Sequence, residues 1–127
     1  MKIKLIAPCG MNCNLCSGYL RDKKKCPGCR EENDSKPDYC VRCIIKNCDQ
    51  LKKNNWKYCT KKCEKYPCRR LKDLDKRYRT KYNMSMIRNL EIIDRDGIRR
   101  LINIEKEKWI IGNEIYCVHQ KKYYKLS

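Results

Sequence analysis

The chain has no phenylalanine and only one histidine among its 127 residues. Isoleucine, leucine and valine together account for 24 of these residues, and the formal net charge is +17. Few aliphatic side chains and a high net charge are typical of chains at the border of disorder. The shortage is greatest over residues 21–68, where the large aliphatic and tryptophan side chains are Val41, Ile44, Ile45, Leu51 and Trp56. Hydrophobic burial cannot order such a stretch by itself, so another interaction must hold it.

The signatures of common enzymes are also missing. His119 is the sole histidine, and the chain shows no Ser/His/Asp set, glycine-rich phosphate loop or paired-carboxylate motif. A zinc enzyme keeps an open coordination position, and only a three-thiolate site of Cys9, Cys13 and Cys16 would offer one. The sequence therefore favours a binding protein over an enzyme. A thiol-based redox or metal-handling role stays open if a reactive cysteine is accessible.

No apolar run approaches the ~20 residues that a membrane span needs. The opening stretch MKIKLIAPCG is too short for a secretory signal peptide. We therefore expect a cytoplasmic protein without membrane contact, whose thiols stay reduced. Clustered thiols in that compartment are more often metal ligands or catalytic groups than disulfide bridges.

Cysteine is the residue that the chain has in excess, with 12 copies. Those before residue 69 are closely spaced, as Cys9-x3-Cys13-x2-Cys16, Cys26-x2-Cys29, Cys40-x2-Cys43-x4-Cys48 and Cys59-x3-Cys63-x4-Cys68. A gap of two residues lets both sulfurs turn onto one tetrahedral ion. Pro27 and Gly28 fill one such gap and favour a tight turn. These cysteines are the predicted metal ligands, with Cys117 and His119 as further candidates.

Zinc binds four-cysteine sites of this spacing and can build a fold outright. We expect about two to three zinc ions per chain, one for each set of four ligands. An iron–sulfur cluster is the alternative. The first triplet also matches the cluster motif of radical enzymes that use S-adenosylmethionine, but those enzymes need a barrel for which this chain is too short.

The thiols can be grouped in more than one way. One set of four would be Cys26, Cys29, Cys40 and Cys43, and another would be Cys48, Cys59, Cys63 and Cys68. The first triplet would then need a fourth ligand from Cys117, from His119 or from a cysteine of another set. In a further alternative, Cys9 is not a ligand.

Periodicity predicts a mostly α-helical chain with short β elements. Residues 2–7 could form a strand, and residues 14–25 and 41–53 short helices, the second ended by Asn54-Asn55. Pro67 suits the first turn of a helix that runs to Tyr82. Ser85 is the predicted cap of a helix ended by Asp96-Gly97. A helix over residues 98–109 and a hairpin over 113–126, with its turn at Gln120-Lys121, complete the chain.

The predicted fold class is thus a small metal-stabilised protein, with cysteine knuckles in front and a helical C-terminal half that ends in a β-hairpin. The cysteine-rich region covers residues 1–68 and the helical region residues 69–127, and we expect the two to form one compact unit.

A basic stripe follows one face of the predicted helix after Pro67. Its residues are Arg69, Lys72, Lys76 and Arg79, with Arg70 and Arg77 beside them. Three zinc ions, each bound by four thiolates, would lower the formal charge of +17 by 6 to about +11. Basic zinc modules often contact nucleic-acid phosphates, so the stripe is a candidate nucleic-acid surface. The alternative is a solvated face with ordinary ion pairs, such as Asp73–Arg77 and Asp75–Arg79.

The motifs CGMNCNLCSGYL, KKCPGC, CVRCIIKNC and CEKYPCRRL occur in that order. In this the chain resembles a cysteine-rich prokaryotic family known as domain of unknown function 3795, over residues 8 to about 109. The resemblance implies a small zinc-binding, zinc-finger-like protein with no established activity. Many members carry a further zinc ribbon after the tryptophan, of which Cys117-Val118-His119 remains here. A metal-free hairpin packed by Trp109, Ile115, Tyr116 and Tyr123 is the expectation for this end.

Together these features predict a multi-zinc structural module that presents a basic surface to a macromolecular partner, either nucleic acid or another protein.

Overall fold

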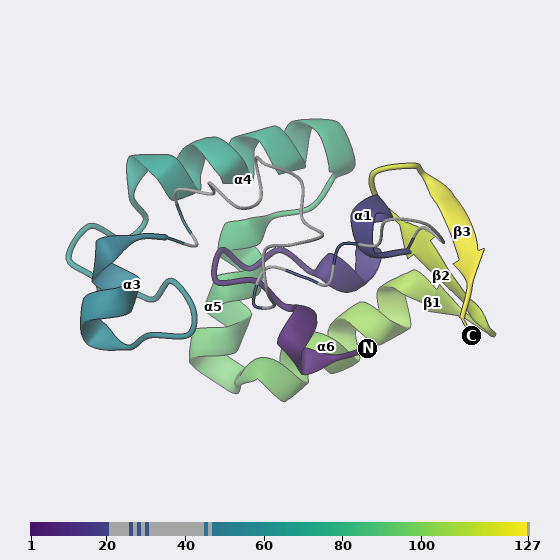
Figure 1. Ribbon diagram of the computed structural model, residues 1–127, viewed down its shortest axis with the longest axis horizontal. Helices are drawn as coiled ribbons and strands as arrows, with labels where there is room; N and C mark the ends of the chain where they lie inside the picture. Colours follow the sequence, from purple (N-terminus) through teal and green to yellow (C-terminus); the bar gives the residue numbers. More distant parts are fainter. Residues whose placement is uncertain (21–25, 27, 29, 31–44, 46, 127) are drawn as a thin grey trace.

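The computed structural model describes residues 1–20, 26, 28, 30, 45 and 47–126. This part of the chain contains five α-helices and one three-stranded antiparallel sheet (Figure 1). The predicted ligands Cys29, Cys40 and Cys43 lie outside the described residues. So do residues 21–25, 41–44 and 46 of the two predicted short helices.

The N-terminal segment is not the strand that its alternating pattern predicts. Instead, Ile3–Leu5 forms a 3-10 turn, in which the backbone N–H groups of Leu5 and Ile6 donate to the carbonyls of Lys2 and Ile3. A strand needs a partner along its length, and here one isolated bridge joins Ile6 to Asn12. A second 3-10 turn at Cys13–Leu15 and helix α1 at Ser17–Leu20 follow.

The next helix, α3, is Asp49–Asn54. Asn55 ends it in the left-handed conformation, at φ 53°, as the Asn54-Asn55 pair predicted. Cys48 is its N-cap residue and therefore lies just before the helix rather than within it.

Three longer helices form the C-terminal half, as predicted: α4 at Arg69–Tyr82, α5 at Met86–Asp96 and α6 at Ile98–Trp109. Helix α4 begins two residues after Pro67, with Cys68 as its N-cap. Ser85 caps α5 as expected, because its Oγ accepts a hydrogen bond of 3.1 Å from the backbone N–H of Arg88. Gly97, at φ 89°, separates α5 from α6.

The sheet consists of β1 at Ile110–Ile111, β2 at Glu114–Cys117 and β3 at Lys122–Lys125, in that spatial order. The predicted hairpin β2–β3 is confirmed, and β1 adds a short strand that continues directly from α6. The Trp109 and Tyr116 rings stack at 5.5 Å between centroids, and Tyr123 meets Tyr116 edge-on at 5.3 Å.

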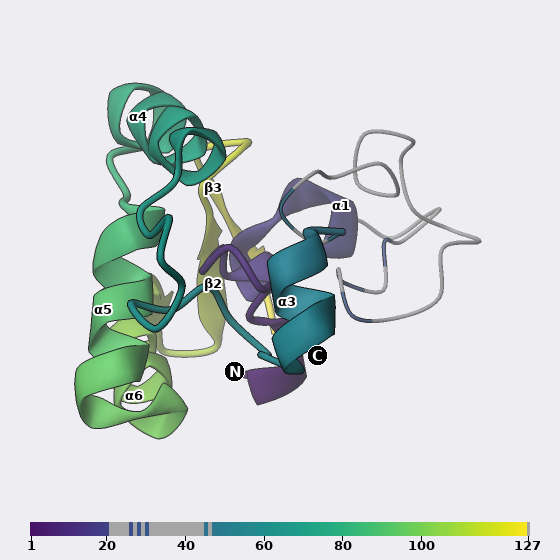
Figure 2. The same cartoon turned by 90° about the vertical axis from the view of Figure 1, so that its left-hand side faces the viewer.

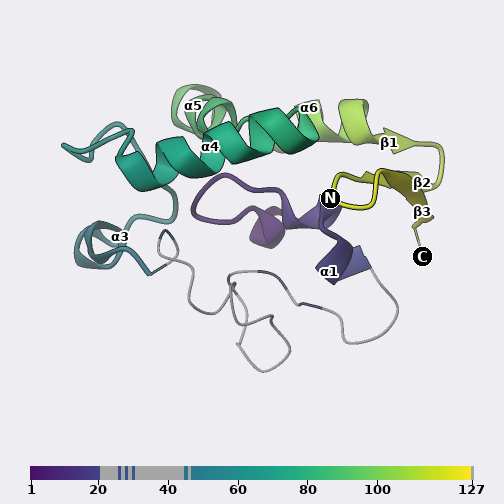
Figure 3. The same cartoon turned by 90° about the horizontal axis from the view of Figure 1, so that it is seen from above.

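The N-terminal segment runs through the middle of the molecule, between α5 on one side and α1 and α3 on the other (Figures 2 and 3). The largest core cluster accordingly takes residues from both halves of the chain: Leu5, Leu15, Leu71, Leu90, Ile115 and Val118. Burial of each such side chain contributes about 1.5–3 kcal/mol. Gly10 permits the close approach, because a Cβ atom there would lie 2.8 Å from the carbonyl oxygen of Met86.

Candidate metal centres

The four cysteines of one predicted set line the same cavity. Cys48, Cys59, Cys63 and Cys68 all line one small cavity of about 40 Å³. The side chains between them are mainly apolar and include Leu51, Trp56 and Leu71. A space of that size exceeds the ~10–15 Å³ that a single water needs. The sequence grouping of these four cysteines therefore agrees with their placement around a common space.

Backbone contacts hold this segment against the rest of the fold. The N–H of Cys59 donates to the carbonyl of Pro8 at 2.9 Å. Asp94 of α5 accepts hydrogen bonds from the Thr60 hydroxyl and the Lys61 N–H, both at 3.2 Å. These hydrogen bonds tie the segment to Pro8 and to α5.

Two of these thiols stand at the starts of helices. Cys48 is the N-cap of α3 and Cys68 the N-cap of α4, and neither side chain makes a capping hydrogen bond. The positive end of a helix dipole favours negative charge nearby, as a thiolate ligand would carry.

A second group of thiols joins the two ends of the chain. Cys26 lies beside Gly18, where a Cβ atom would be 3.3 Å from the Cys26 Cβ and 3.5 Å from the Cys16 Sγ. Burial raises the pKa of Cys16, while backbone hydrogen bonds from Gly18 and Tyr19 oppose the shift, and the thiols of Cys26 and Cys117 are close enough to act on it. Cys117 is fully buried, and its Sγ accepts a hydrogen bond from the Gln120 N–H at 3.5 Å.

The hairpin contacts this group because Val118, directly after β2, pairs with the turn at Cys13–Leu15. The N–H of Val118 donates to the carbonyl of Leu15 at 3.1 Å. Within the knuckle, the Asn12 side chain accepts a hydrogen bond of 3.0 Å from the Asn14 N–H and so shapes the turn around Cys13. Cys117 is therefore placed near Cys16, the last thiol of the first triplet.

Both ring nitrogens of His119 have polar partners. Nδ1 accepts a hydrogen bond of 3.4 Å from the Ser17 N–H, and Nε2 lies 3.3 Å from the hydroxyl of Tyr78. Because Nδ1 accepts, the N–H group of the neutral ring is at Nε2, and it donates a hydrogen bond to the Tyr78 hydroxyl. Burial lowers the pKa of His119, which keeps the ring neutral at pH 7. In this arrangement the imidazole links α1 to α4.

Cys9 and Cys13 are both buried, at 7% exposed, and lie near Tyr78. Burial raises the pKa of Tyr78, and the nearby thiols of Cys9, Cys16 and Cys13 add to the shift. No disulfide bond joins the cysteines that the structure describes. Among those same residues, no three histidine, cysteine, aspartate or glutamate side chains are arranged so that they could already hold a metal ion.

The predicted basic stripe lies on α4, at one edge of the molecule (Figure 1). All six residues are exposed: Arg69, Arg70, Lys72, Lys76, Arg77 and Arg79. Arg69 lies 3.9 Å from Asp73, and Arg79 pairs with Asp75 at 2.7 Å. The described part of the chain gives the other four no ion pair. The opposite face of α4, with Leu71, Leu74, Tyr78 and Tyr82, contributes to the core, as predicted.

The sequence did not lead us to predict two buried acidic residues, Asp75 and Glu105. Asp75 is 4% exposed and Glu105 is 5% exposed. Each lies three or four residues from apolar residues of the same helix, and therefore on the apolar helix face: Asp75 between Leu71 and Tyr78, and Glu105 after Ile102. That position is the signal which could have identified them.

No protein-family model, no curated protein and no solved structure matches this chain. The resemblance to domain of unknown function 3795 therefore stays a prediction. Among the described residues, no helix is both long and apolar enough to cross a membrane.

Proposed function

We propose that this protein is a multi-zinc structural module that presents the basic face of α4 to nucleic acid. The observation that carries the proposal is the shared cavity of Cys48, Cys59, Cys63 and Cys68. Four thiolates with apolar surroundings are the donor set that structural zinc takes. Bound zinc would supply the folding energy that the sparse aliphatic content of residues 21–68 does not.

A second zinc ion would be held by Cys16, Cys26 and Cys117, which the structure brings close together. Cys29 is the expected fourth ligand, because only the two residues Pro27 and Gly28 separate it from Cys26 in the CPGC motif. This grouping differs from the one that spacing alone suggested, in which Cys26 and Cys29 share an ion with Cys40 and Cys43. A cytoplasmic location and membership of the family that the motifs resemble are consistent with the proposal.

The first experiment measures metal content and the absorption spectrum of protein purified without oxygen. We expect about two to three zinc ions per chain and no visible absorption, since zinc has no d–d bands. Cys63→Ser and Cys16→Ser should each lose about one zinc ion, and the double variant about two, because they belong to separate sites. Iron and sulfide in the protein would contradict the proposal and favour an iron–sulfur or redox function.

Lys62→Ser is the matched control, because Lys62 is exposed and precedes Cys63 directly. It should keep the full zinc content. If Cys63→Ser retained the same zinc content as Lys62→Ser, the cavity of four cysteines would not be a metal site.

The second experiment measures the affinity for single-stranded DNA and RNA against salt concentration. A basic face that contacts phosphates releases counterions, so the logarithm of the affinity should fall linearly with the logarithm of salt. Lys72→Glu/Lys76→Glu should weaken binding and reduce the slope by about 1.4, or about 0.7 per lost contact. Lys52→Glu/Lys53→Glu changes the charge equally on exposed residues of α3 and is the control. No salt-sensitive binding to either polymer would exclude the nucleic-acid surface and favour a protein partner.

A further inference from the structure

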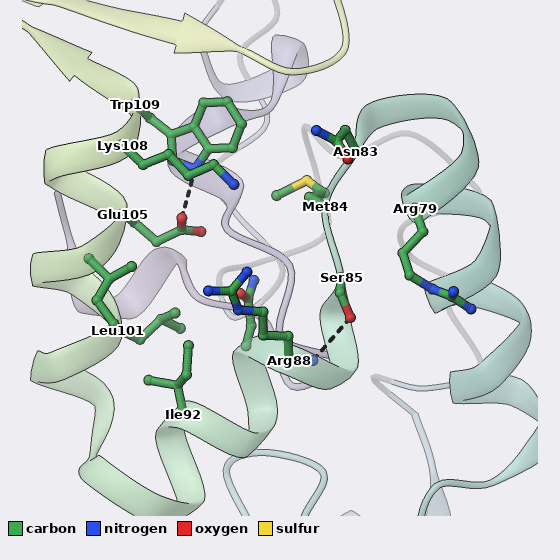
Figure 4. A pocket seen from close by; sticks show the side chains of 12 residues that line it. Arg79, Asn83, Met84, Ser85, Arg88, Ile92, Leu101, Glu105, Lys108 and Trp109 are labelled. Atoms are coloured by element: carbon green, nitrogen blue, oxygen red, sulfur yellow. Dashed lines mark hydrogen bonds between the residues drawn. The ribbon is translucent and has the colours of Figure 1, made fainter.

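A second cavity, of about 220 Å³, lies between α5 and α6 and is lined by none of the described cysteines (Figure 4). Its walls come from the α4–α5 connection at residues 83–85, from α5 and from α6. The apolar part of the lining includes Ile92, Leu101 and Ile104. Sites for drug-sized ligands span ~300–1,000 Å³, so this cavity suits a smaller molecule or one unit of a polymer.

Glu105 is the acidic residue of this cavity. Its Oε2 accepts a hydrogen bond of 2.6 Å from the indole Nε1–H of Trp109. Its Oε1 is buried and has no partner within hydrogen-bond distance among the described residues, although the Asn12 side chain lies near enough to act on the carboxyl group. In Figure 4 this second oxygen points toward the space that the labelled side chains surround. Because a buried acceptor without a donor is costly, the arrangement calls for an N–H or O–H group from elsewhere.

Burial raises the pKa of Glu105, although the side chains of Trp109 and Asn12 and the charges of Lys108 and Arg88 oppose the shift. The two cations are exposed residues of the cavity wall, and in Figure 4 they extend into the same space as the carboxyl group. Arg79 adds a third cation at the rim and already pairs with Asp75. The opening thus carries positive side chains, and the buried Glu105 carboxyl group lies in the wall behind them.

We propose that this cavity binds a nucleotide, with a base N–H group donating to Glu105 Oε1 and the phosphate contacting Arg88 and Lys108. A simple anion would satisfy the cations and leave Oε1 without a donor. A nucleotide satisfies both, since carboxylates accept from exocyclic amino groups of bases and guanidinium groups pair with phosphate. The apolar lining also suits a flat base, as in proteins that bind an unstacked base.

The nucleotide could be free or part of a single strand. Arg79 belongs both to the basic stripe of α4 and to the rim of the cavity. A strand that follows the stripe would therefore pass the opening and could place one base inside. In this polymeric form the inference rests on the proposed function, whereas binding of a free nucleotide does not need the stripe.

The experiment follows the indole N–H resonances by NMR while ribonucleoside monophosphates are added. Trp109 reports on the cavity through its bond to Glu105, and Trp56, in the cysteine cavity, is the internal control. We expect a saturable shift of the Trp109 resonance with at least one nucleotide and none of the Trp56 resonance. Inorganic phosphate should not reproduce the shift. If phosphate alone produced the same shift with the same affinity, the cavity would be a plain anion site and the inference would be wrong.

Two variants test the assigned contacts. Glu105→Gln keeps an acceptor for Trp109 but offers an N–H₂ group in place of Oε1, and Arg88→Gln removes a phosphate contact. Each should weaken nucleotide binding at least about tenfold, the usual effect of losing a charged hydrogen bond. Glu107→Gln, an exposed position of α6, should bind as the wild type does. Equal affinities for Glu105→Gln and Glu107→Gln would refute the role of Glu105.

A final comparison separates this inference from the proposed function. Lys72→Glu/Lys76→Glu should weaken binding of single-stranded DNA and leave mononucleotide binding unchanged, because neither lysine lines the cavity. A Trp109 shift with oligonucleotides but not mononucleotides would identify the polymer as the ligand. If neither ligand shifted the Trp109 resonance, the inference would fail even if DNA still bound α4.

Discussion

The buried carboxylate of Asp75 joins α4 to the start of α5, and its replacement should be costly. It accepts three hydrogen bonds: 2.6 Å from the Ser85 hydroxyl, 2.7 Å from Arg79 Nε and 3.0 Å from the Ile87 N–H. Hydrogen bonds to a charged group contribute ~1.5–3 kcal/mol each and are not additive. Asn keeps one acceptor oxygen, and the Arg79 side chain, 60% exposed, can be rehydrated. We therefore expect Asp75→Asn to lower the free energy of unfolding by about 2–4 kcal/mol.

The loss should be large enough to see by thermal unfolding. The entropy of unfolding is ~2.1 cal/mol/K per residue, or about 270 cal/mol/K for this chain. The expected decrease in Tm is then about 7–15 °C. Asp73→Asn is the matched control on the same helix, because its pair with Arg69 is 3.9 Å long and the side chains are 95% and 73% exposed. Such a pair contributes at most about 1 kcal/mol.

The effect of Asp75 should also depend on pH. Burial opposes ionisation of this group, but the hydrogen bonds from Ser85, Ile87 and Arg79 outweigh it and hold the pKa below the usual 3.8. Because the pKa is lower in the folded state than in the unfolded state, the stabilisation is complete above pH 3.8 and is lost as pH falls through the folded-state value. The wild type and Asp75→Asn should therefore converge in acid. The reasoning is refuted if Asp75→Asn costs no more than Asp73→Asn, or if the difference is unchanged at acid pH.

Two further predictions concern single sites. Gly10→Ala should lower the free energy of unfolding in urea by about 1–3 kcal/mol more than Gly97→Ala. Both residues have φ +89°, but only the Cβ at residue 10 would meet another atom within 4 Å. Equal decreases would show that the Met86 carbonyl moves away at no cost. Tyr66→Phe should keep or increase the Tm, because burial raises the pKa of Tyr66 to about 12 and its buried hydroxyl has no partner among the described residues. Tyr78→Phe, which loses the contact with His119, should instead cost about 1 kcal/mol, and a similar loss for Tyr66→Phe would mean that its hydroxyl is satisfied.

The helices of the C-terminal half could be predicted because their signals are local. Ser85 caps α5 through its own side chain, and Gly97 ends it with a positive φ. The strand expected at residues 2–7 was wrong for a reason that no local pattern reveals. Alternation of Lys and Ile favours a strand only where a neighbouring strand exists, and this segment instead crosses the core with Leu5 and Ile6 buried.

The candidate site was predictable in part. The spacing predicted that Cys48, Cys59, Cys63 and Cys68 form one set, because all four lie in one short stretch of the chain. In the structure they line one cavity. Spacing could not show that Cys117 lies beside Cys16, since this depends on how the hairpin docks. The cavity between α5 and α6 was equally hidden, because Arg88, Glu105 and Lys108 line a common space only when these two helices pack together.

The pairing of Val118 with Leu15, and of His119 with Ser17 across 102 residues, has a consequence for the order of folding. Contacts of such long sequence separation form late, since most of the chain must first be arranged between them. During synthesis Ser17 is made 102 residues before His119, so this contact cannot form until His119 has left the ribosome. Until then the Cys16 thiol lacks its neighbour Cys117 and is more open to oxidation.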